Sequence, residues 1–197
     1  MFDRSIFEAP ATEVAPLLLG AVLRVDDVAL RITEVEAYLG ESDPGSHAFR
    51  GRGQRNAVMY GPPGHLYTYF TYGMHTCANV VCMPEGTASG VLLRAGRIIE
   101  GVEVARARRA SSRTDDDLAR GPGRLCVAMG ITLADGGADL AGPRIRLELP
   151  QERSAYATGP RTGVSGAGGT DDYPWRFFLP GDPTVSPYKA HVPKRRA

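Results

Sequence analysis

The sequence lacks long apolar runs and a basic leader. No stretch approaches the roughly 18 consecutive apolar residues that a membrane-spanning helix needs. The longest early apolar run, from Pro16 to Leu23, is not preceded by the basic segment that a secretory signal peptide carries. We therefore expect a soluble, cytoplasmic protein with no membrane partner.

Cysteine is scarce as well. Cys77, Cys82 and Cys126 are an odd number and form no Cys-x-x-Cys pair, which excludes a disulfide framework and a structural zinc site. His65 and His75 lie near two of these cysteines, but the spacing matches no common zinc pattern. We expect reduced thiols in the core, no metal and no cofactor.

A surplus of charge of one sign is also absent. The 23 Lys and Arg residues balance 22 Asp and Glu residues, for a net charge of +1. A strongly basic nucleic-acid-binding protein usually shows a clear excess of Lys and Arg. Positive charge is gathered only locally, at Arg50, Arg52 and Arg55 and again at Arg120 and Arg124. Such clusters can mark a binding surface, but an arginine-rich composition also produces them by chance.

The chain does have enough apolar residues for one core. Its 197 residues are 43% hydrophobic, which predicts a single domain spanning residues 1–197. Alternating apolar residues predict strands, and apolar residues three to four apart predict helices. The predicted strands cover residues 21–25, 28–38, 65–71, 75–82, 90–97, 144–149 and 175–179, and the predicted helices cover an opening segment through Leu19 capped by Thr12, then 100–109 and 124–129. The expected fold class is α+β, with a mainly antiparallel curved sheet flanked by helices.

Two polar, glycine-rich stretches interrupt this pattern. Residues 40–64 are too polar for a core element, and a long ordered loop in a compact domain is usually functional. Residues 158–174 form the second stretch. The run from Gly163 to Gly169 could wrap a phosphate through its backbone amides or could simply be flexible, and both interpretations stay open.

The strand predicted over residues 28–38 carries two acids. In an unbroken strand, the period of two puts Ile32, Glu34, Glu36 and Tyr38 on one face. A carboxylate in such a place often pairs with an arginine of a neighbouring strand, which would give Glu36 a structural role. A second interpretation is favoured by Tyr38 on the same face and by His47 downstream, since both supply stacking surfaces beside a carboxylate. That combination fits a pocket for a flat, electron-poor ring.

The segment from His65 to Cys82 is predicted to be a hairpin that turns at Tyr72 and Gly73. Tyr67 and Tyr69 share one face of its first strand, whereas Tyr72 lies at the turn, where burial is difficult. An aromatic at such a turn either folds back onto the surface or acts as a wedge between stacked nucleic-acid bases.

The order of the motifs along the chain is specific. They are Thr33-Glu-Val-Glu-Ala-Tyr-Leu-Gly40 followed by Asp43 and His47, Arg55-Asn-Ala-Val-Met-Tyr60, Pro63-Gly-His-Leu-Tyr-Thr-Tyr-Phe-Thr-Tyr-Gly-Met74, Asn79, Leu92-Leu-Arg94, Gly121-Pro-Gly-Arg-Leu-Cys126 and Arg176-Phe-Phe178. Together they resemble the alkyladenine, or 3-methyladenine, DNA glycosylase family over nearly the whole chain. The resemblance implies a fold akin to the C-terminal domain of formyltransferases.

The resemblance also implies roles for individual residues. Glu36 would be the general base that deprotonates a water, and Arg94 would lie beside that water and a nearby phosphate. The other implied roles are stacking around a flipped base for Tyr38, His47 and Tyr69, exclusion of the 2-amino group of guanine for Asn79, a wedge for Tyr72, a DNA probe beside the lesion for Met59, and a phosphate ligand at a helix start for Arg124.

The implied activity is that of a monofunctional DNA glycosylase in base excision repair. It would flip an alkylated or deaminated purine out of duplex DNA and hydrolyse the N-glycosidic bond, leaving an abasic site. Bifunctional glycosylases attack with an amine, but the two lysines, Lys189 and Lys194, lie in the C-terminal tail, so no lyase activity is expected. Two alternatives stay open: a lesion-binding protein that does not cut, and an RNA- or nucleotide-processing enzyme on the same scaffold.

The implied partner is double-stranded DNA that contains damaged purines, bound by a monomer that would be nucleoid-associated in a bacterium. The near-neutral charge predicts weak non-specific affinity with strong salt dependence. The sequence leaves open whether 3-methyladenine, 7-methylguanine, hypoxanthine or ethenoadenine is removed. It also leaves open whether a protein acid protonates a neutral leaving base.

Overall fold

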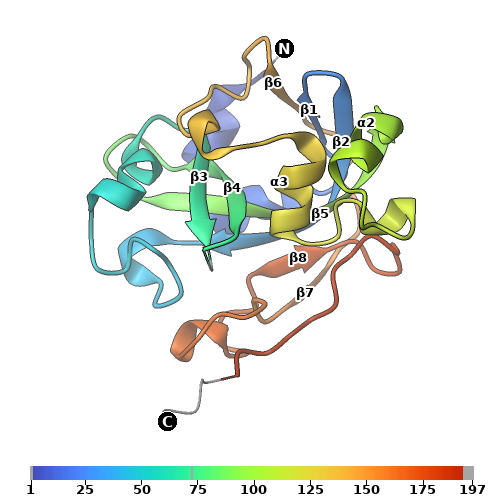
Figure 1. Cartoon of the computed structure of the whole chain (residues 1–197). Coiled ribbons are helices and arrows are strands. Elements are labelled where there is room, and N and C mark those ends of the chain that lie inside the picture. Colours follow the sequence, from blue (N-terminus) through green and yellow to red (C-terminus); the bar gives the residue numbers. More distant parts are fainter. Residues whose placement is uncertain (1, 72, 193–197) are drawn as a thin grey trace.

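The computed structural model describes residues 2–71 and 73–192, and a curved sheet forms its centre (Figure 1). Eight strands of these residues lie in the order β3-β4-β5-β2-β1-β6, with β8 beside β2 and β7 beside β8. Every strand pair among them is antiparallel. The strands are β1 (Val22–Val25), β2 (Val28–Tyr38), β3 (Leu66–Thr71), β4 (His75–Cys82), β5 (Ser89–Glu100), β6 (Ile145–Glu148), β7 (Ala157–Gly159) and β8 (Arg176–Phe178).

The helices are short and surround the sheet. Helix α3 packs against β4 and β5, and α2 packs against α3 (Figure 1). The α-helices are α1 (Ala11–Val14), α2 (Val102–Arg108) and α3 (Pro122–Met129), and the 3-10 helices are η1 (Arg4–Glu8), η2 (Ala15–Leu18), η3 (Gly40–Ser42), η4 (Gln54–Tyr60), η5 (Asp115–Asp117), η6 (Leu133–Asp135) and η7 (Ala167–Gly169). An antiparallel sheet with a few separate helices confirms the predicted α+β class.

Alternation along the strands gives the sheet two different sides. On β5, Val91 and Leu93 join the main hydrophobic core, whereas Leu92 and Arg94 line a cavity on the other side. On β3, Leu66 belongs to the core and Tyr67 lines the cavity. The period of two along a strand therefore supplies both the core that stabilises the fold and the wall of the candidate site.

Strand β2 is the centre of the sheet, and a β-bulge changes which of its residues face the core. Ile32 pairs with Gly96 and Glu34 pairs with Ala95, so Thr33 is an extra residue between two paired positions. Ile32 belongs to the core, and after the bulge Val35 does so instead. The prediction that Ile32 shares a face with Glu34 was wrong, because it assumed an unbroken strand.

Close packing accompanies this bulge. A Cβ atom on Gly96 would lie 2.4 Å from Cδ2 of Leu30 and 2.5 Å from the carbonyl oxygen of Arg31. Only glycine allows β5 to approach β2 at this distance. The side chain of Leu30 fills the space that a residue at position 96 would otherwise occupy, and this holds the register from which Glu34 and Glu36 project.

The N-terminal segment differs from the expected helix. It contains η1, in which Asp3 accepts a hydrogen bond from the amide of Ser5, and then the single turn of α1, which begins after Pro10. Thr12 lies inside α1 and is not its cap. Two prolines, Pro10 and Pro16, account for the break, since proline lacks the amide that a continuous helix would use.

The remaining predictions for the chain are mostly confirmed. The predicted strands and the helices 100–109 and 124–129 match β1–β6, β8, α2 and α3 within a few residues, while the very short β7 was missed. The polar stretch of residues 40–64 contains η3 and η4. The three cysteines are free and buried, as expected. Among residues 2–71 and 73–192, no helix is long and apolar enough to span a membrane.

Candidate active site

A cavity of about 530 Å³ opens on the side of the sheet opposite the main core. Strands β2, β3, β4 and β5 supply one wall, and residues 162–165 of the glycine-rich stretch supply another. Seven of the nine site residues predicted from the sequence line it: Glu36, Tyr38, His47, Met59, Tyr69, Asn79 and Arg94. Residues far apart in the sequence thus meet in one place, and a cavity of this size is typical of small-molecule sites.

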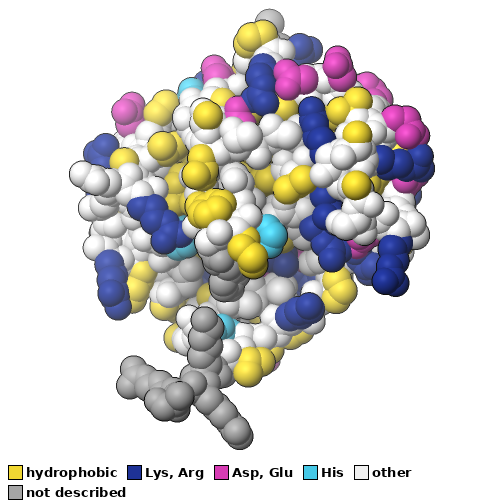
Figure 2. Space-filling model, in the orientation of Figure 1, with side chains coloured by type: hydrophobic (Ala, Val, Ile, Leu, Met, Phe, Trp, Pro, Cys, Tyr) yellow, Lys and Arg dark blue, Asp and Glu magenta, His cyan; other side chains and the backbone are white. Residues whose placement is uncertain are grey.

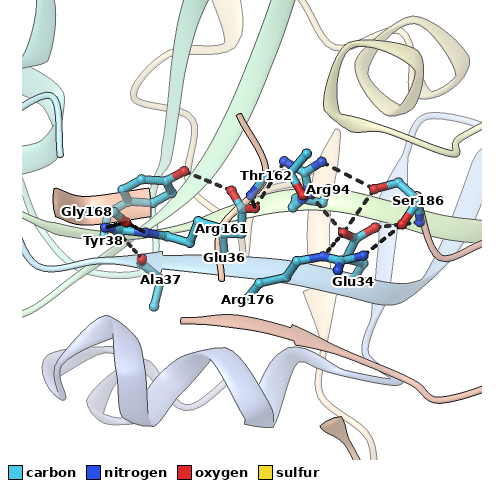
Figure 3. Close-up of polar contacts among 10 residues, drawn as sticks. All are labelled: Glu34, Glu36, Ala37, Tyr38, Arg94, Arg161, Thr162, Gly168, Arg176 and Ser186. Atoms are coloured by element: carbon cyan, nitrogen blue, oxygen red, sulfur yellow. Dashed lines mark hydrogen bonds and ion pairs between the residues drawn. The ribbon is translucent and has the colours of Figure 1, made fainter. Parts of the chain in front are cut away.

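Glu36 lies on β2, is fully buried and forms part of the cavity wall. Both oxygens of its carboxylate accept hydrogen bonds. The hydroxyl of Tyr38 donates to Oε2 (2.8 Å), and the backbone amide of Thr162 donates to Oε1 (2.6 Å). Nη1 of Arg94 lies 3.3 Å from Oε1. These three groups converge on the carboxylate (Figure 3) and fix its orientation toward the cavity. Two interpretations of Glu36 were open from the sequence alone. Both arrangements are present, because Glu36 pairs with Arg94 of the neighbouring strand β5 and also lies in a cavity lined by tyrosines.

Arg94 is held from behind by a second buried carboxylate, that of Glu34 (Figure 3). Nε of Arg94 and Nε of Arg176 both donate to Oε1 of Glu34, at 3.0 and 2.6 Å. Burial by itself would raise the pKa of Glu34, but the charges of Arg94 and Arg176 outweigh it and hold that pKa below its ordinary value. Burial would lower the pKa of Arg94, but the carboxylates of Glu36 and Glu34 raise it above its ordinary value. No role was predicted for Glu34 alone, because the two arginines that bind it lie 60 and 142 residues away in the sequence.

Tyr38 has an arginine packed on its ring. The guanidinium of Arg161 lies 4.5 Å from the ring centroid, and it is buried in a two-bond ion pair with Asp43, at 2.6 and 2.7 Å. A Cβ on Gly168 would lie 2.5 Å from the amide nitrogen of Gly45, so the two loops touch at glycines around this pair. Burial, followed by the charge of Glu36, raises the pKa of Tyr38 well above its ordinary value, so the hydroxyl stays protonated and donates. Arg161 was missed because nothing in its local sequence shows that it is buried.

His47 and Tyr69 pack against each other edge to face. Their ring centroids lie 4.4 Å apart at an interplanar angle of 83°, an arrangement that aromatic quadrupoles favour. Nδ1 of His47 lies 3.4 Å from the hydroxyl of Tyr67. Partial desolvation of the imidazole, then the nearby charge of Arg55, lowers the pKa of His47. The imidazole is therefore neutral at pH 7, and it borders the cavity without adding positive charge.

The remaining predicted residues lie in different environments. Asn79 is buried in the cavity wall, with Nδ2 donating to the carbonyl of Tyr67 (3.2 Å). Met59 is 4% exposed and packs in the same cavity wall, and its role as a probe of the DNA beside the lesion stays a prediction. Met74, beside the turn of the β3–β4 hairpin, is 69% exposed.

The other two predicted site residues are Tyr72 and Arg124. Tyr72 falls outside the described residues. Arg124 is half exposed in the first turn of α3, where it forms an ion pair with Asp117 and does not line the cavity, although its neighbour Pro122 does. A phosphate at this helix start would have to share Arg124 with that carboxylate.

One residue that the sequence analysis set aside reaches the site. Lys189, which was predicted to lie in the C-terminal tail, lines the cavity. Its backbone carbonyl accepts a hydrogen bond from the amide of Gly163 (2.8 Å). The chain after β8 runs back to the cavity, and no periodic pattern in its sequence predicts this course.

Part of the arginine cluster predicted from the sequence lies beside the cavity, because Arg55 packs over the cavity-lining ring of Tyr69. Arg50, Arg52 and Arg55 are exposed and form no ion pair with any of the described residues. Arg52 and Arg55 lie over the rings of Tyr60 and Tyr69, at 5.7 and 5.8 Å. Figure 2 shows Lys and Arg side chains on both flanks of the lower half of this face, whereas acidic side chains gather toward its upper rim. The near-neutral total therefore conceals a local basic surface.

Comparison with known proteins agrees with this geometry. The family described as methylpurine-DNA glycosylase (MPG) matches residues 5–183. Proteins named "Putative 3-methyladenine DNA glycosylase" are similar over nearly the whole chain: that of Leifsonia xyli is 63% identical (95% of this chain, 92% of the relative), that of Streptomyces avermitilis 55% (98% and 94%) and that of Burkholderia lata 50% (94% and 91%). A match of this extent, together with a carboxylate in an aromatic-lined cavity, leads to one conclusion: the chain belongs to the methylpurine-DNA glycosylase family.

Proposed function

We propose that residues 1–197 act as one DNA glycosylase domain, a monomer in base excision repair. It flips an alkylated purine out of duplex DNA into the cavity and hydrolyses the N-glycosidic bond with a water that Glu36 activates, leaving an abasic site. The observation that carries the proposal is the Glu36 carboxylate, oriented by Thr162, Tyr38 and Arg94 at the wall of a cavity bordered by tyrosines. The family match and the relatives' names support the same reaction.

The chemistry explains why a carboxylate belongs there. Cleavage of an N-glycosidic bond builds positive charge on the sugar, so Glu36 stabilises the transition state and also accepts the proton of the attacking water. Because fixed donors bind both of its oxygens, the carboxylate of Glu36 does not have to reorient during the reaction. Arg94 lies beside the carboxylate, where it can hold the water and a nearby phosphate.

The composition of the cavity favours cationic lesions such as 3-methyladenine. Tyr38 and Tyr69 offer aromatic surfaces, and a neutral His47 does not repel a positively charged base. A cationic base is a good leaving group and needs no protein acid. Hypoxanthine and ethenoadenine are neutral and would need one, so we expect them to be removed more slowly than 3-methyladenine or 7-methylguanine.

The hairpin between β3 and β4 supplies the wedge for base flipping. Tyr72 is proposed to fill the gap that the extruded nucleotide leaves in the stack, and the exposed Met74 contacts the DNA next to it. Insertion of an apolar group into a stack has no purpose for a mononucleotide substrate. This feature favours duplex DNA over the nucleotide-processing alternative.

The direct test uses duplexes that each carry one defined lesion. After incubation with the protein and EDTA, hot alkali should cut the strand at the lesion position, because the product is an abasic site. Glu36→Gln should bind the same duplexes with unchanged affinity but lose cleavage by a factor of at least 10², the size of a general-base contribution. Cleavage by Glu36→Gln at the wild-type rate would refute the role of Glu36, and a wild-type protein that binds without cutting would be a lesion-binding protein.

A further inference from the structure

The segment after β8 is tied into the catalytic network by buried contacts. We name residues 184–189 the C-terminal strap. The amide and hydroxyl of Ser186 donate to Oε2 and Oε1 of Glu34, at 2.7 and 3.0 Å, and the carbonyl of Ser186 accepts from Nη2 of Arg176 (2.7 Å). Figure 3 shows these contacts of Ser186. Thr184 is fully buried, and its hydroxyl lies 2.8 Å from that of Thr33. The strap is thus anchored at its start by the carboxylate that also holds Arg94.

The far end of the strap is fixed as well. The carbonyl of Lys189 accepts from the amide of Gly163, and the preceding residue, Thr162, donates its amide to Glu36. Lys189 and the proposed base are therefore bound to consecutive residues of one loop. Because Glu36 is fully buried in the wall whereas Lys189 is exposed and also lines the cavity, the lysine lies at its rim.

Charge distinguishes Lys189 from the other ionic groups of the cavity. Glu36 and Arg94 pair with each other, and Arg94 also pairs with Glu34. No carboxylate of the described residues forms an ion pair with Lys189. An ammonium group at the rim is thus available for an anion that approaches from solvent.

We propose that Lys189 binds a backbone phosphate that flanks the extruded nucleotide, an inference that rests on the proposed function. When the base occupies the cavity and the sugar lies at Glu36, the flanking phosphates must cross the rim. Lysine is a strong phosphate ligand that acts as a mobile point charge. The strap delivers that charge to the site, and its anchoring at Ser186 places it without help from a regular element.

A competing role for Lys189 is attack on the abasic sugar. Such a step would form an imine between its amine and C1′ of the opened sugar with loss of water, and β-elimination would follow. It requires a deprotonated amine, whereas phosphate binding requires the ammonium ion. The two roles therefore differ in whether arginine can replace lysine.

The experiment compares wild type with Lys189→Gln, Lys189→Arg and a matched control, Arg146→Gln. Arg146 is exposed on β6, at the sheet edge farthest from β3, and it does not line the cavity. Affinity for a duplex with a tetrahydrofuran abasic analogue is measured over a range of NaCl concentrations. The slope of log affinity against log salt concentration is negative, and Lys189→Gln should make it less steep by about 0.9, as expected for one lost phosphate contact. Lys189→Arg and Arg146→Gln should keep the wild-type slope.

The outcomes separate this inference from the proposed function. If wild type excises the lesion and Lys189→Gln keeps the full slope, Lys189 does not bind phosphate although the glycosylase assignment stands. A borohydride-trapped adduct with wild type that Lys189→Arg lacks would assign the covalent role instead. A wild-type protein that neither excises nor binds would overturn the proposed function and this inference with it.

Discussion

His47 illustrates how one side chain can set the pH range of the pocket. Because burial and Arg55 lower its pKa from the ordinary 6.5, the neutral form predominates at pH 7 and gives way to the cation only in more acidic solution. The charged imidazole would repel a cationic base at the cavity wall. It would repel a neutral base much less.

We therefore expect the ratio of excision rates for 7-methylguanine over hypoxanthine to fall as the pH is lowered from 7 to about 5. Taking the ratio removes those effects of pH that both reactions share. In His47→Gln the ratio should change little with pH. A wild-type ratio that rises on acidification would contradict this role for His47.

Several site residues were predictable singly because each lies in a short motif with its own chemistry. Glu36 and Tyr38 were found from strand periodicity, and the bulge at Thr33 did not affect them because both follow it. The position of Lys189 at the cavity was not predicted, because nothing in the local sequence shows where an irregular segment runs. The exposure of Met74 depends on the position of the hairpin end in space, which residue spacing does not reveal.

The bulge in β2 and the C-terminal strap decide together how the acids are used. After the bulge, Glu34 and Glu36 point away from the core, and Glu34 receives the strap through Ser186. The strands themselves were predictable because alternation is a local signal. The bulge was not, since it depends on the partner strand and on the close approach of Gly96 to Leu30.

Glu34→Gln should destabilise the protein strongly. It leaves Arg94 and Arg176 without their shared buried carboxylate, at a cost of about 3–5 kcal/mol, or roughly 10 °C in melting temperature. Because the folded-state pKa of Glu34 lies below its ordinary 4.5, this stabilisation is complete above that pH and is lost as the pH falls through the lowered pKa. The difference in melting temperature between Glu34→Gln and wild type should therefore become smaller as the pH is lowered below 4.5.

Glu148→Gln is the matched control. Glu148 pairs with Arg24 at the surface, with about half of its side chain exposed, and such pairs contribute little. Calorimetry at pH 7 should find its melting temperature within about 2 °C of wild type. Equal losses in the two variants would show that burial of the Glu34 network adds nothing.

At the scale of the whole molecule, positive and negative charges nearly cancel, but they are unevenly distributed over the face that Figure 2 shows. A net charge of +1 gives little general attraction to DNA, whereas clustered exposed arginines concentrate positive charge locally. We expect affinity for undamaged duplex to be weak and to fall about 40-fold between roughly 50 and 200 mM salt, as for about three phosphate contacts. Fluorescence anisotropy with an undamaged duplex measures this, and an affinity independent of salt would exclude a binding mode based on phosphates.

The hydrogen bonds between Glu34 and Ser186 join residues 152 positions apart. During synthesis, the sheet strands that carry Glu34, Glu36 and Arg94 emerge from the ribosome long before Ser186 does. Until then, the buried carboxylate of Glu34 lacks the donors of Ser186. The loop that donates to Glu36 also lacks its hydrogen bond to the carbonyl of Lys189. A chain that ends before Ser186 would thus contain strands β1 to β6 and β8 while Glu34 still lacks the two hydrogen bonds that Ser186 donates to it.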